Sequence, residues 1–172
     1  MNQHTIKKIY FEQVSSESQL ALVEEMAGEI WREHYTPIIG SDQVSYMLDK
    51  FQSVPAMKEQ MGQGYEYYVI NKENQRVGYL SFVKKADALF LSKVYVLKSF
   101  RRKGIGLAAM HFVERSALER NCSKVSLTVN KNNRNSIRAY KKAGYRNTES
   151  IVMDIGEGYV MDDYKFEKEI VI

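Results

Sequence analysis

The stretch from residue 89 to residue 129 constrains the fold most, because its hydrophobic period changes twice. Crowded Leu, Phe, Val and Tyr residues predict a strand over 89–97. Apolar side chains then recur at helical spacing over 105–118, and a short apolar strand is expected over 124–129. A strand, a helix and a strand in this order form a right-handed crossover whose two strands run parallel. The chain is therefore expected to contain a parallel strand pair.

The residues before this stretch favour helices. Ser16 and Gln19 fit the capping box that opens a helix, and apolar residues follow at spacings of three and four. Later signals are expected to delimit three helices: a break at Pro37 and Gly40, a cap at Ser41 and a start at Pro55.

The remaining segments favour strands around one further helix. Runs at 65–70, 77–83 and 89–97 with short links are typical of an antiparallel meander. A helix is expected to begin at Asn132 or Asn133 and to close at Gly144, and a final hairpin is expected from 151–154 and 159–170. The predicted fold is a mixed α/β sheet, mostly antiparallel with one parallel crossover and flanked by helices.

Length and composition set the class of protein. With 172 residues, of which 44% are hydrophobic and 27% charged, the chain is expected to form one domain over residues 1–172. Its one cysteine, Cys122, excludes an internal disulfide framework, and three scattered histidines make a catalytic metal unexpected. No apolar run is long enough to span a membrane, and residues 1–8 lack the apolar core of a signal peptide. A cytoplasmic protein without a metal and without a membrane partner is therefore expected.

The loop between the strand at 89–97 and the following helix carries the chemical signal. Gly104 and Gly106 lie where backbone N–H groups are free and the helix dipole is positive, and glycine leaves these amides open to phosphate oxygens. Four cations crowd the same place: Lys98, Arg101, Arg102 and Lys103. The segment predicts a pyrophosphate cradle. The simpler alternatives are a solvated basic turn and a glycine-opened helix without a ligand.

Two other nucleotide-binding motifs fit this loop less well. Gly104, Gly106 and Ala109 match the dinucleotide pattern G-x-G-x-x-G/A. That pattern also needs an acidic residue about 20 positions further on, whereas the next strand ends in Thr128-Val129-Asn130. A P-loop is excluded because no Gly-Lys-Ser/Thr follows.

The segment from Val94 to Gly106 resembles the signature of the GNAT superfamily of acetyl-CoA-dependent N-acetyltransferases. In that signature a strand ends in an apolar-x-Val pattern, and Arg/Gln-x-x-Gly-x-Gly/Ala opens a helix. The segment from Asn133 to Tyr145 resembles the family's Asn-x-x-Ala-x-x-x-Tyr-x-x-x-Gly-Phe element, in the right order along the chain. Four positions depart from the usual residues: Lys98 for Pro, Arg102 for Gly, Ser136 for Ala and Tyr145 for Phe. The first two add positive charge and the last two preserve size.

The resemblance implies acetyl-CoA as co-substrate, bound by a core at about residues 89–145. It implies that the backbone of Val94 and Val96 binds the pantetheine arm, that Asn133 lies near this arm, and that Tyr140 gives a proton to the leaving sulfur. The pyrophosphate is then held by the backbone of consecutive residues: Arg101, Arg102, Lys103, Gly104, Ile105, Gly106, Leu107 and Ala108. The alternatives are that Asn133 only caps a helix and that Tyr140 is only a core aromatic.

The expected reaction is direct attack of a primary amine on the thioester, with the Val96 N–H stabilising the oxyanion. A covalent cysteine route is disfavoured because Cys122 has no nearby His or Asp in the sequence. The general base is not defined, since Leu91-Ser92-Lys93 supplies no carboxylate. Candidates for the acceptor side are the polar residues Glu33, His34, Glu157, Asp162 and Asp163 and the aromatic residues Tyr35, Tyr65, Tyr67 and Tyr68.

The acidic final hairpin slightly favours a small cationic amine, such as a polyamine, as acceptor. A protein N-terminus or lysine, a non-catalytic CoA-binding protein and a nucleic-acid-binding module are the alternatives. The net charge of +4 permits a nucleic-acid binder but is shared by many ordinary enzymes. A nucleic-acid partner is not expected, and the resemblance is compatible with a homodimer.

Overall fold

The computed structural model describes residues 8–171. Residues 1–7, which include most of the segment searched for a signal peptide, and Ile172 lie outside the described residues. The elements follow in this order: β1 (Ile9–Gln13), α1 (Glu17–Ile39), α2 (Ser41–Gln52), α3 (Val54–Gly62), β2 (Glu66–Lys72), β3 (Gln75–Lys85), β4 (Ala88–Val96), a short 3₁₀ turn (Lys98–Phe100), α4 (Ile105–Glu119), β5 (Lys124–Asn130), α5 (Arg134–Lys142), β6 (Arg146–Gly156) and β7 (Tyr159–Glu169). Within residues 8–171 no helix is long and apolar enough to cross a membrane.

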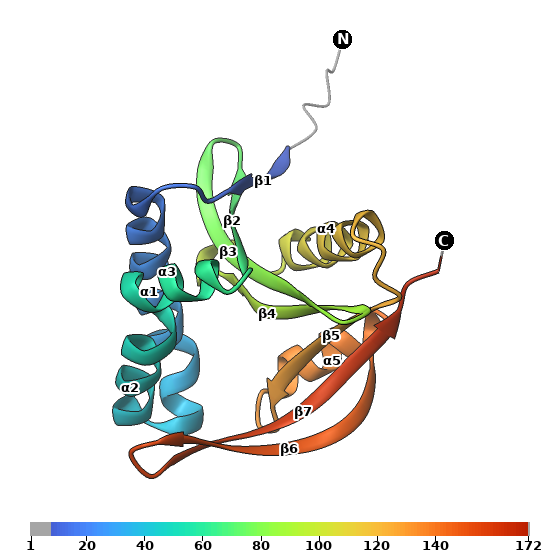
Figure 1. Cartoon of the computed structure of the whole chain (residues 1–172). Helices are drawn as coiled ribbons and strands as arrows, with labels where there is room; N and C mark the ends of the chain where they lie inside the picture. Colours follow the sequence, from blue (N-terminus) through green and yellow to red (C-terminus); the bar gives the residue numbers. More distant parts are fainter. Residues whose placement is uncertain (1–7, 172) are drawn as a thin grey trace.

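One seven-stranded sheet organises the chain, in the order β1-β2-β3-β4-β5-β7-β6. All neighbouring pairs are antiparallel except β4 and β5, which run parallel. The helices α1, α2 and α3 cover one face, and α4 and α5 cover the other (Figure 1). The predicted mixed sheet, with its meander, its single parallel crossover and its final hairpin, is confirmed.

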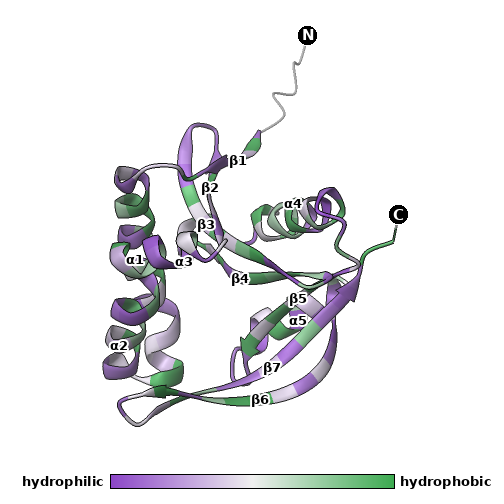
Figure 2. Cartoon of the chain, in the orientation of Figure 1, coloured by the Kyte–Doolittle hydropathy of each residue, from purple (hydrophilic) through white to green (hydrophobic). Residues whose placement is uncertain are grey.

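Each face of the sheet has its own hydrophobic core. On one face Leu89, Leu91 and Leu127 pack against Ile105 and Val113 of α4. On the other face Trp31, Met47 and Met57 of the three N-terminal helices pack with strand residues such as Tyr79. Figure 2 shows the contrast within the sheet, since β5 is largely hydrophobic and β7 largely hydrophilic. The side of the sheet to which a strand residue points therefore decides which core it joins.

Three local expectations for the chain need correction. Pro37 does not break α1, because it lies in the last turn, where the missing N–H removes only one helical hydrogen bond. The helix ends at Gly40, whose N–H donates to Thr36 O at 3.0 Å. Ser41 does not cap α2 but is its first residue, and Gly40, at φ 85°, joins the two helices directly. The strand β1, which was not expected, exists through its pairing with β2.

A bulge at Ser92 shapes the middle of the sheet. The register between β3 and β4 shifts between the pairs Phe82–Leu91 and Ser81–Lys93, so Ser92 is the extra residue. The parallel pairing of β4 with β5 covers only Ala88–Leu91 against Lys124–Leu127. Beyond Leu91 the two strands separate, and β5 continues along β7 instead. A gap in the sheet thus begins at the bulge.

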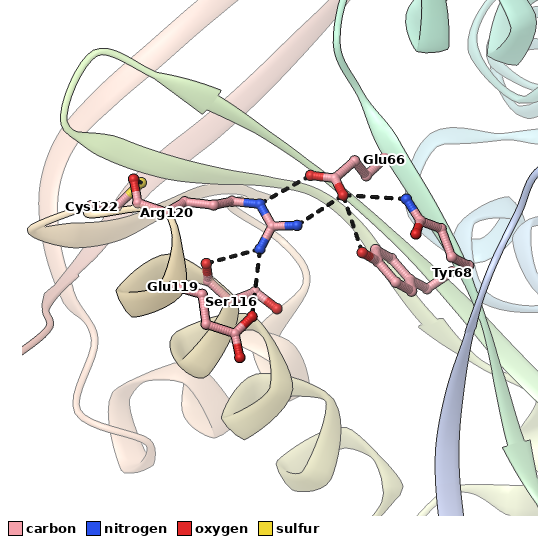
Figure 3. Close-up of polar contacts among 7 residues, drawn as sticks. Glu66, Tyr68, Ser116, Glu119, Arg120 and Cys122 are labelled. Carbon is pink, nitrogen blue, oxygen red and sulfur yellow. Dashed lines mark hydrogen bonds and ion pairs between the residues drawn. The ribbon is translucent and has the colours of Figure 1, made fainter.

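The far end of α4 is fixed to the sheet by an ion pair. The Arg120 guanidinium donates to both oxygens of the Glu66 carboxylate at 3.1 and 2.8 Å, and it also donates to the Ser116 carbonyl at 3.0 Å. Tyr68 donates its hydroxyl to the same carboxylate at 3.1 Å (Figure 3). Cys122, beside this cluster, is buried in the core. These contacts hold the end of α4 that lies away from its glycine loop.

Candidate active site

The open edge of β4 provides the first part of the site. The Leu97 N–H donates to Val77 O at 2.8 Å. In an antiparallel pair every second residue bonds to the neighbouring strand, so Val94 and Val96 are residues of β4 that do not bond to β3. The N–H and C=O groups of Val94 and Val96 therefore point away from β3 into the gap, while their side chains pack on the α4 side. These are the backbone groups that the sequence singled out, and no strand covers them.

A cavity of about 790 Å³ passes through this gap. Its walls include Leu91–Val96 of β4 and Leu127–Asn130 of β5. Arg101, Arg102 and Gly106 line one end. The other end lies between α1, α2 and β7, and its lining residues include Trp31, Tyr35, Met47 and Met161. The separation of the two strands thus connects the glycine loop with the face covered by the N-terminal helices.

The glycine loop presents bare backbone at its end of the cavity. Gly104 has φ +80°, which favours glycine, and it precedes α4 without any side-chain cap. Apart from the adjacent residues and the nearby backbone of α4 itself, no atom among the described residues lies within 4 Å of the position that a Cβ would occupy at Gly104 or at Gly106. The first N–H groups of α4 are therefore open to an anion, and the helix dipole favours one there.

The side chains around this loop fall into two groups. Arg102, Lys103 and Leu107 are exposed, whereas Ile105 is buried at 1% exposure and anchors the helix in the core. Of the eight consecutive residues predicted to hold a pyrophosphate, Arg101, Arg102 and Gly106 line the cavity itself. The other five do not line the cavity and lie beside these three in the loop or the first turn of α4: Lys103, Gly104, Ile105, Leu107 and Ala108.

Arg101 has a tethering contact that the sequence did not show. Its Nε donates to Val96 O at 3.0 Å, and its two terminal nitrogens donate to the Glu33 carboxylate at 3.1 and 2.8 Å. The hydrogen bond from Arg101 lowers the pKa of Glu33. Glu33 is therefore engaged in joining α1 to the loop, and its lowered pKa makes it a weak base.

Three tyrosines from opposite faces of the sheet line the cavity. Tyr140 comes from α5, and its ring lies 6.0 Å from that of Tyr145 and 6.4 Å from that of Phe166. Tyr35 of α1 and Tyr95 of β4 come from the opposite face, with ring centroids 6.2 Å apart. Burial, and secondarily the nearby Tyr35, raises the pKa of Tyr140 well above its ordinary value. Its hydroxyl thus stays protonated and is a proton donor at neutral pH.

Asn133 lies at the start of α5 without acting as a side-chain cap. It is buried, at 4% exposure, and its Oδ1 is 3.3 Å from the Nε2 of His34, which lies on α1 across the cavity. Burial and the Arg101 charge lower the pKa of His34, so the ring is neutral at neutral pH and can donate this hydrogen bond. Asn133 thus occupies the N-cap position of α5, but its side chain contacts His34 instead of capping the helix.

Asp163 is the carboxylate of the far end of the cavity. It lies on β7 opposite Asn130 of β5 and on the same face as Met161, toward α1. It is buried, at 6% exposure, and it is the one Asp or Glu among residues 8–171 that lines the cavity. Burial, followed by the neighbouring Asp162, raises its pKa to about 6, while Thr128 and Lys131 oppose this increase.

The remaining acceptor-side candidates lie elsewhere. Glu157 is exposed in the hairpin turn, and Asp162 is exposed and paired with Lys131 at 2.7 Å. Tyr67 is buried beneath α3, where its hydroxyl donates to Gln60, and Tyr68 stacks on Phe82 on the α4 side of the sheet. Neither these two nor Tyr65 lines the cavity, so within the described chain Tyr35 alone of the four candidate tyrosines does.

Lys93, at the strand position where the sequence offered no carboxylate, has an unusual environment. It is only 5% exposed, its amine donates to Gln60 Oε1 at 2.7 Å, and it lies over the ring of Tyr67 at 5.1 Å. Burial lowers its pKa from 10.5 to about 7. No ion pair to Lys93 occurs among residues 8–171. Its signal in the sequence was only a lysine within an apolar strand.

The family of this chain follows from comparison of its sequence. The model of the GNAT acetyltransferase family matches residues 24–145, which are more than half of the chain. The chain belongs to the GNAT acetyltransferase family. The uncharacterized protein YxbD of Bacillus subtilis is 32% identical to this GNAT chain over 81 residues, which cover 46% of the chain and 49% of YxbD. The matched region thus spans about half the length of that curated relative.

Solved structures show the same GNAT fold. The PaiA N-acetyltransferase of Thermoplasma acidophilum, in complex with coenzyme A, has a TM-score of 0.77 at 17% identity, over 94% of this GNAT chain and 99% of that protein. A GCN5-related N-acetyltransferase of Rhodopseudomonas palustris has a TM-score of 0.79 at 12% identity, over 96% and 99% of the two chains. At these identities the likeness concerns the fold.

The residues of this GNAT chain fit acetyl-CoA. The bare positions at Gly104 and Gly106, flanked by Lys98 and Arg102, suit a pyrophosphate. The uncovered backbone of Val94 suits an extended amide-containing arm that makes strand-like hydrogen bonds. Among residues 8–171 no three His, Cys, Asp or Glu side chains come together as ligands for a metal ion.

Proposed function

We propose that this protein transfers an acetyl group from acetyl-CoA to a primary amine by direct attack. The observation that carries the proposal is the cavity through the gap between β4 and β5, with open amides at one end and Tyr140 at its middle. Membership of the GNAT family supports acetyl-CoA as the donor.

The binding roles follow from the position of each group. The amides at the start of α4, around Gly104 and Gly106, would hold the pyrophosphate, with Arg102 adding charge. The backbone of Val94 and Val96 would hold the pantetheine arm, and Asn133, oriented by its contact with His34, would lie beside it. Arg101 would keep α1 against the loop through Glu33.

The chemistry requires the nitrogen to lose two protons and the sulfur to gain one. Acetyl-CoA supplies a thioester carbonyl that a neutral amine attacks, forming a C–N bond as the C–S bond breaks. An ammonium of pKa about 10 must lose a proton before its nitrogen can attack. Tyr140, which stays protonated, would donate a proton to the leaving sulfur. The second proton that the nitrogen loses after attack would restore the Tyr140 hydroxyl. The Val96 N–H, which points into the gap, would donate a hydrogen bond to the negative oxygen that develops during attack.

The identity of the amine is a separate matter. In the sequence, the acidic final hairpin slightly favours a polyamine, and nothing in the structure tests that preference directly. Two of the three acidic residues proposed there, Glu157 and Asp162, are exposed, and Asp163 lines the cavity. The support is therefore strongest for one ammonium group, bound at Asp163.

Replacing Tyr140 by phenylalanine tests the proposal. The release of CoA, followed with a thiol reagent, should fall about 100-fold or more, while calorimetry should show acetyl-CoA affinity within about twofold of wild type. Tyr145→Phe is the matched control, because Tyr145 is a neighbouring buried tyrosine whose hydroxyl donates to Glu114 at 3.1 Å and which does not line the cavity. Binding of acetyl-CoA without turnover of any amine would indicate a non-catalytic CoA-binding protein, and absence of binding would refute the donor site.

A further inference from the structure

The far end of the cavity has walls of a definite chemical character. Within the described chain its apolar lining comes from α1 and α2 on one side and from β4 and β7 on the other: Ile30, Trp31, Tyr35, Ile39, Met47, Tyr95, Val160 and Met161. The rings of Trp31 and Tyr35 lie 4.5 Å apart, and those of Trp31 and Tyr95 lie 5.6 Å apart. We call this end the acceptor chamber. Its surface is aromatic and aliphatic, and it suits an apolar body.

The charges along the cavity are distributed unevenly. The basic side chains that line the cavity are Lys93 of β4, Lys98, Arg101 and Arg102 of the loop and Arg138 of α5, and Asp163 is the one carboxylate among its described lining residues. Asp163 pairs in register with Asn130, at the edge where β5 leaves the gap. An ammonium at Asp163 would thus lie beside the gap and between the chamber and the uncovered backbone of β4.

The hairpin is attached to α2 beside the chamber. Gln43 of α2 donates to Val160 O at 2.9 Å, and Tyr46 donates its hydroxyl to Ile155 O at 2.5 Å. Lys50 donates to the same carbonyl of Ile155. These contacts attach α2 to the β6–β7 hairpin, whose turn lies beside the ends of α1 and α2 (Figure 1). Gln43 and Val160 themselves line the cavity, so the contact between them joins the α2 and β7 sides of the chamber.

We propose that the acetyl acceptor is a small primary amine with one positive charge and an apolar, preferably aromatic, body, whose ammonium binds Asp163. The proposal rests on the function proposed above and specifies its acceptor. Aromatic walls hold such a body, and the carboxylate binds the ammonium and takes one proton from it before attack. A second ammonium, as in a polyamine, would find no carboxylate on the described chamber walls, and an unpaired buried charge is costly.

The environment of Asp163 agrees with this role. Its neighbours are Asp162 on its own strand, Thr128 on β5, Lys131 after β5, and Tyr35 on α1, whose pKa Asp163 helps to raise. A carboxyl group whose pKa is about 6 is ionised at neutral pH and is a stronger base than an exposed aspartate.

The test compares matched amines on matched variants. Initial rates of CoA release are measured with 2-phenylethylamine, putrescine, spermidine and a short peptide with a free N-terminus. For wild type, kcat/KM for 2-phenylethylamine should exceed that for each other probe by about tenfold or more. Asp163→Asn should reduce kcat/KM for 2-phenylethylamine about 100-fold, with acetyl-CoA affinity unchanged in calorimetry. Asp162→Asn, next along β7 but exposed, should change it by less than about threefold.

A gain of function provides a second, independent test. Met161→Glu places a second carboxylate on the chamber wall, two residues from Asp163 on the same face of β7. The ratio of kcat/KM for putrescine to that for 2-phenylethylamine should rise about tenfold.

Three outcomes would overturn the acceptor assignment: a wild-type preference for putrescine, spermidine or the peptide, equal effects of the two asparagine variants, or acetyl-CoA binding without turnover of any probe. Failure to bind acetyl-CoA would instead refute the proposed function.

Discussion

Replacing Lys93 by methionine is expected to stabilise the fold, although it removes a hydrogen bond. Lys93 is 5% exposed, and burial lowers the pKa of its amine from 10.5 to about 7. The unfolded chain therefore keeps a proton on Lys93 at pH values where the folded chain has released it. Stability of the wild type should rise with pH between about 7 and 10.5, because the unfolded state binds more protons there. Below pH 7 the amine is protonated in both states, and the full free-energy cost of burying its charge remains.

The size of the effect follows from the same values. Each tenfold change in a protonation equilibrium corresponds to about 1.4 kcal/mol. The lowering of the Lys93 pKa from 10.5 to about 7 therefore corresponds to a loss of stability of at most about 5 kcal/mol near pH 7. Loss of the hydrogen bond from Lys93 to Gln60 destabilises the variant by about 1 kcal/mol, and Gln60 still accepts a hydrogen bond from Tyr67. Methionine fills a similar volume and suits an irregular core. The expected net stabilisation at pH 7 is about 2–4 kcal/mol.

Urea denaturation of wild type and Lys93→Met at pH 6, 7, 8 and 9 measures this effect. The difference in the free energy of unfolding between the two proteins should shrink steadily toward high pH. Lys142→Met, at an exposed position on α5, is the control for loss of a lysine charge. A Lys93→Met protein that is less stable than wild type at pH 7, or a difference that does not change with pH, would show that the buried amine carries no such penalty.

Two further substitutions test the loop and the end of α4. Gly106→Val should weaken acetyl-CoA binding about tenfold or more with little change in stability, because no atom beyond the nearby helix backbone lies within 4 Å of the new Cβ. Calorimetry measures the affinity, and Gly62→Val, at an equally open helical glycine, is the control. Unchanged affinity would mean that phosphates do not approach the Gly106 amide. Arg120→Gln should lower the free energy of unfolding by about 1–2 kcal/mol, because it removes the paired hydrogen bonds to Glu66. Acetyl-CoA affinity should not change. If urea denaturation shows no loss of stability, the ion pair does not contribute to stability.

The sequence predicted the order of the elements because hydrophobic periods and caps are local properties. Ser16 and Gln19 form the capping box, and Gly144, at φ +96°, follows α5 as expected. The strand β1 was missed because residues 9–13 form a strand only through pairing with β2. Ser41 was misassigned because the φ of Gly40 lets α2 begin one residue earlier than a serine cap allows.

The candidate site was predictable where the proposal assigns binding to the backbone, and less so where side chains meet across the fold. The glycine loop and β4 can be recognised in the sequence from residue types at fixed spacing. The pairing of Arg101 with Glu33 and the contact of His34 with Asn133 join residues far apart in the chain, and no local pattern indicates them. Likewise, Asp163 and Asp162 are neighbours of the same type, and only the face of β7 separates a cavity carboxylate from an exposed one.

The early separation of β4 from β5 has a consequence for how such a protein diversifies. The parallel strands share only the pairs from Ala88 to Leu91, so the walls on either side of the opening come from distant stretches of the chain. The proposed acetyl-CoA site depends on residues 94–108, whereas the proposed acceptor chamber depends on the N-terminal helices and the last hairpin. If these assignments hold, mutations in those outer parts would change which amine is accepted and leave the proposed acetyl-CoA site intact.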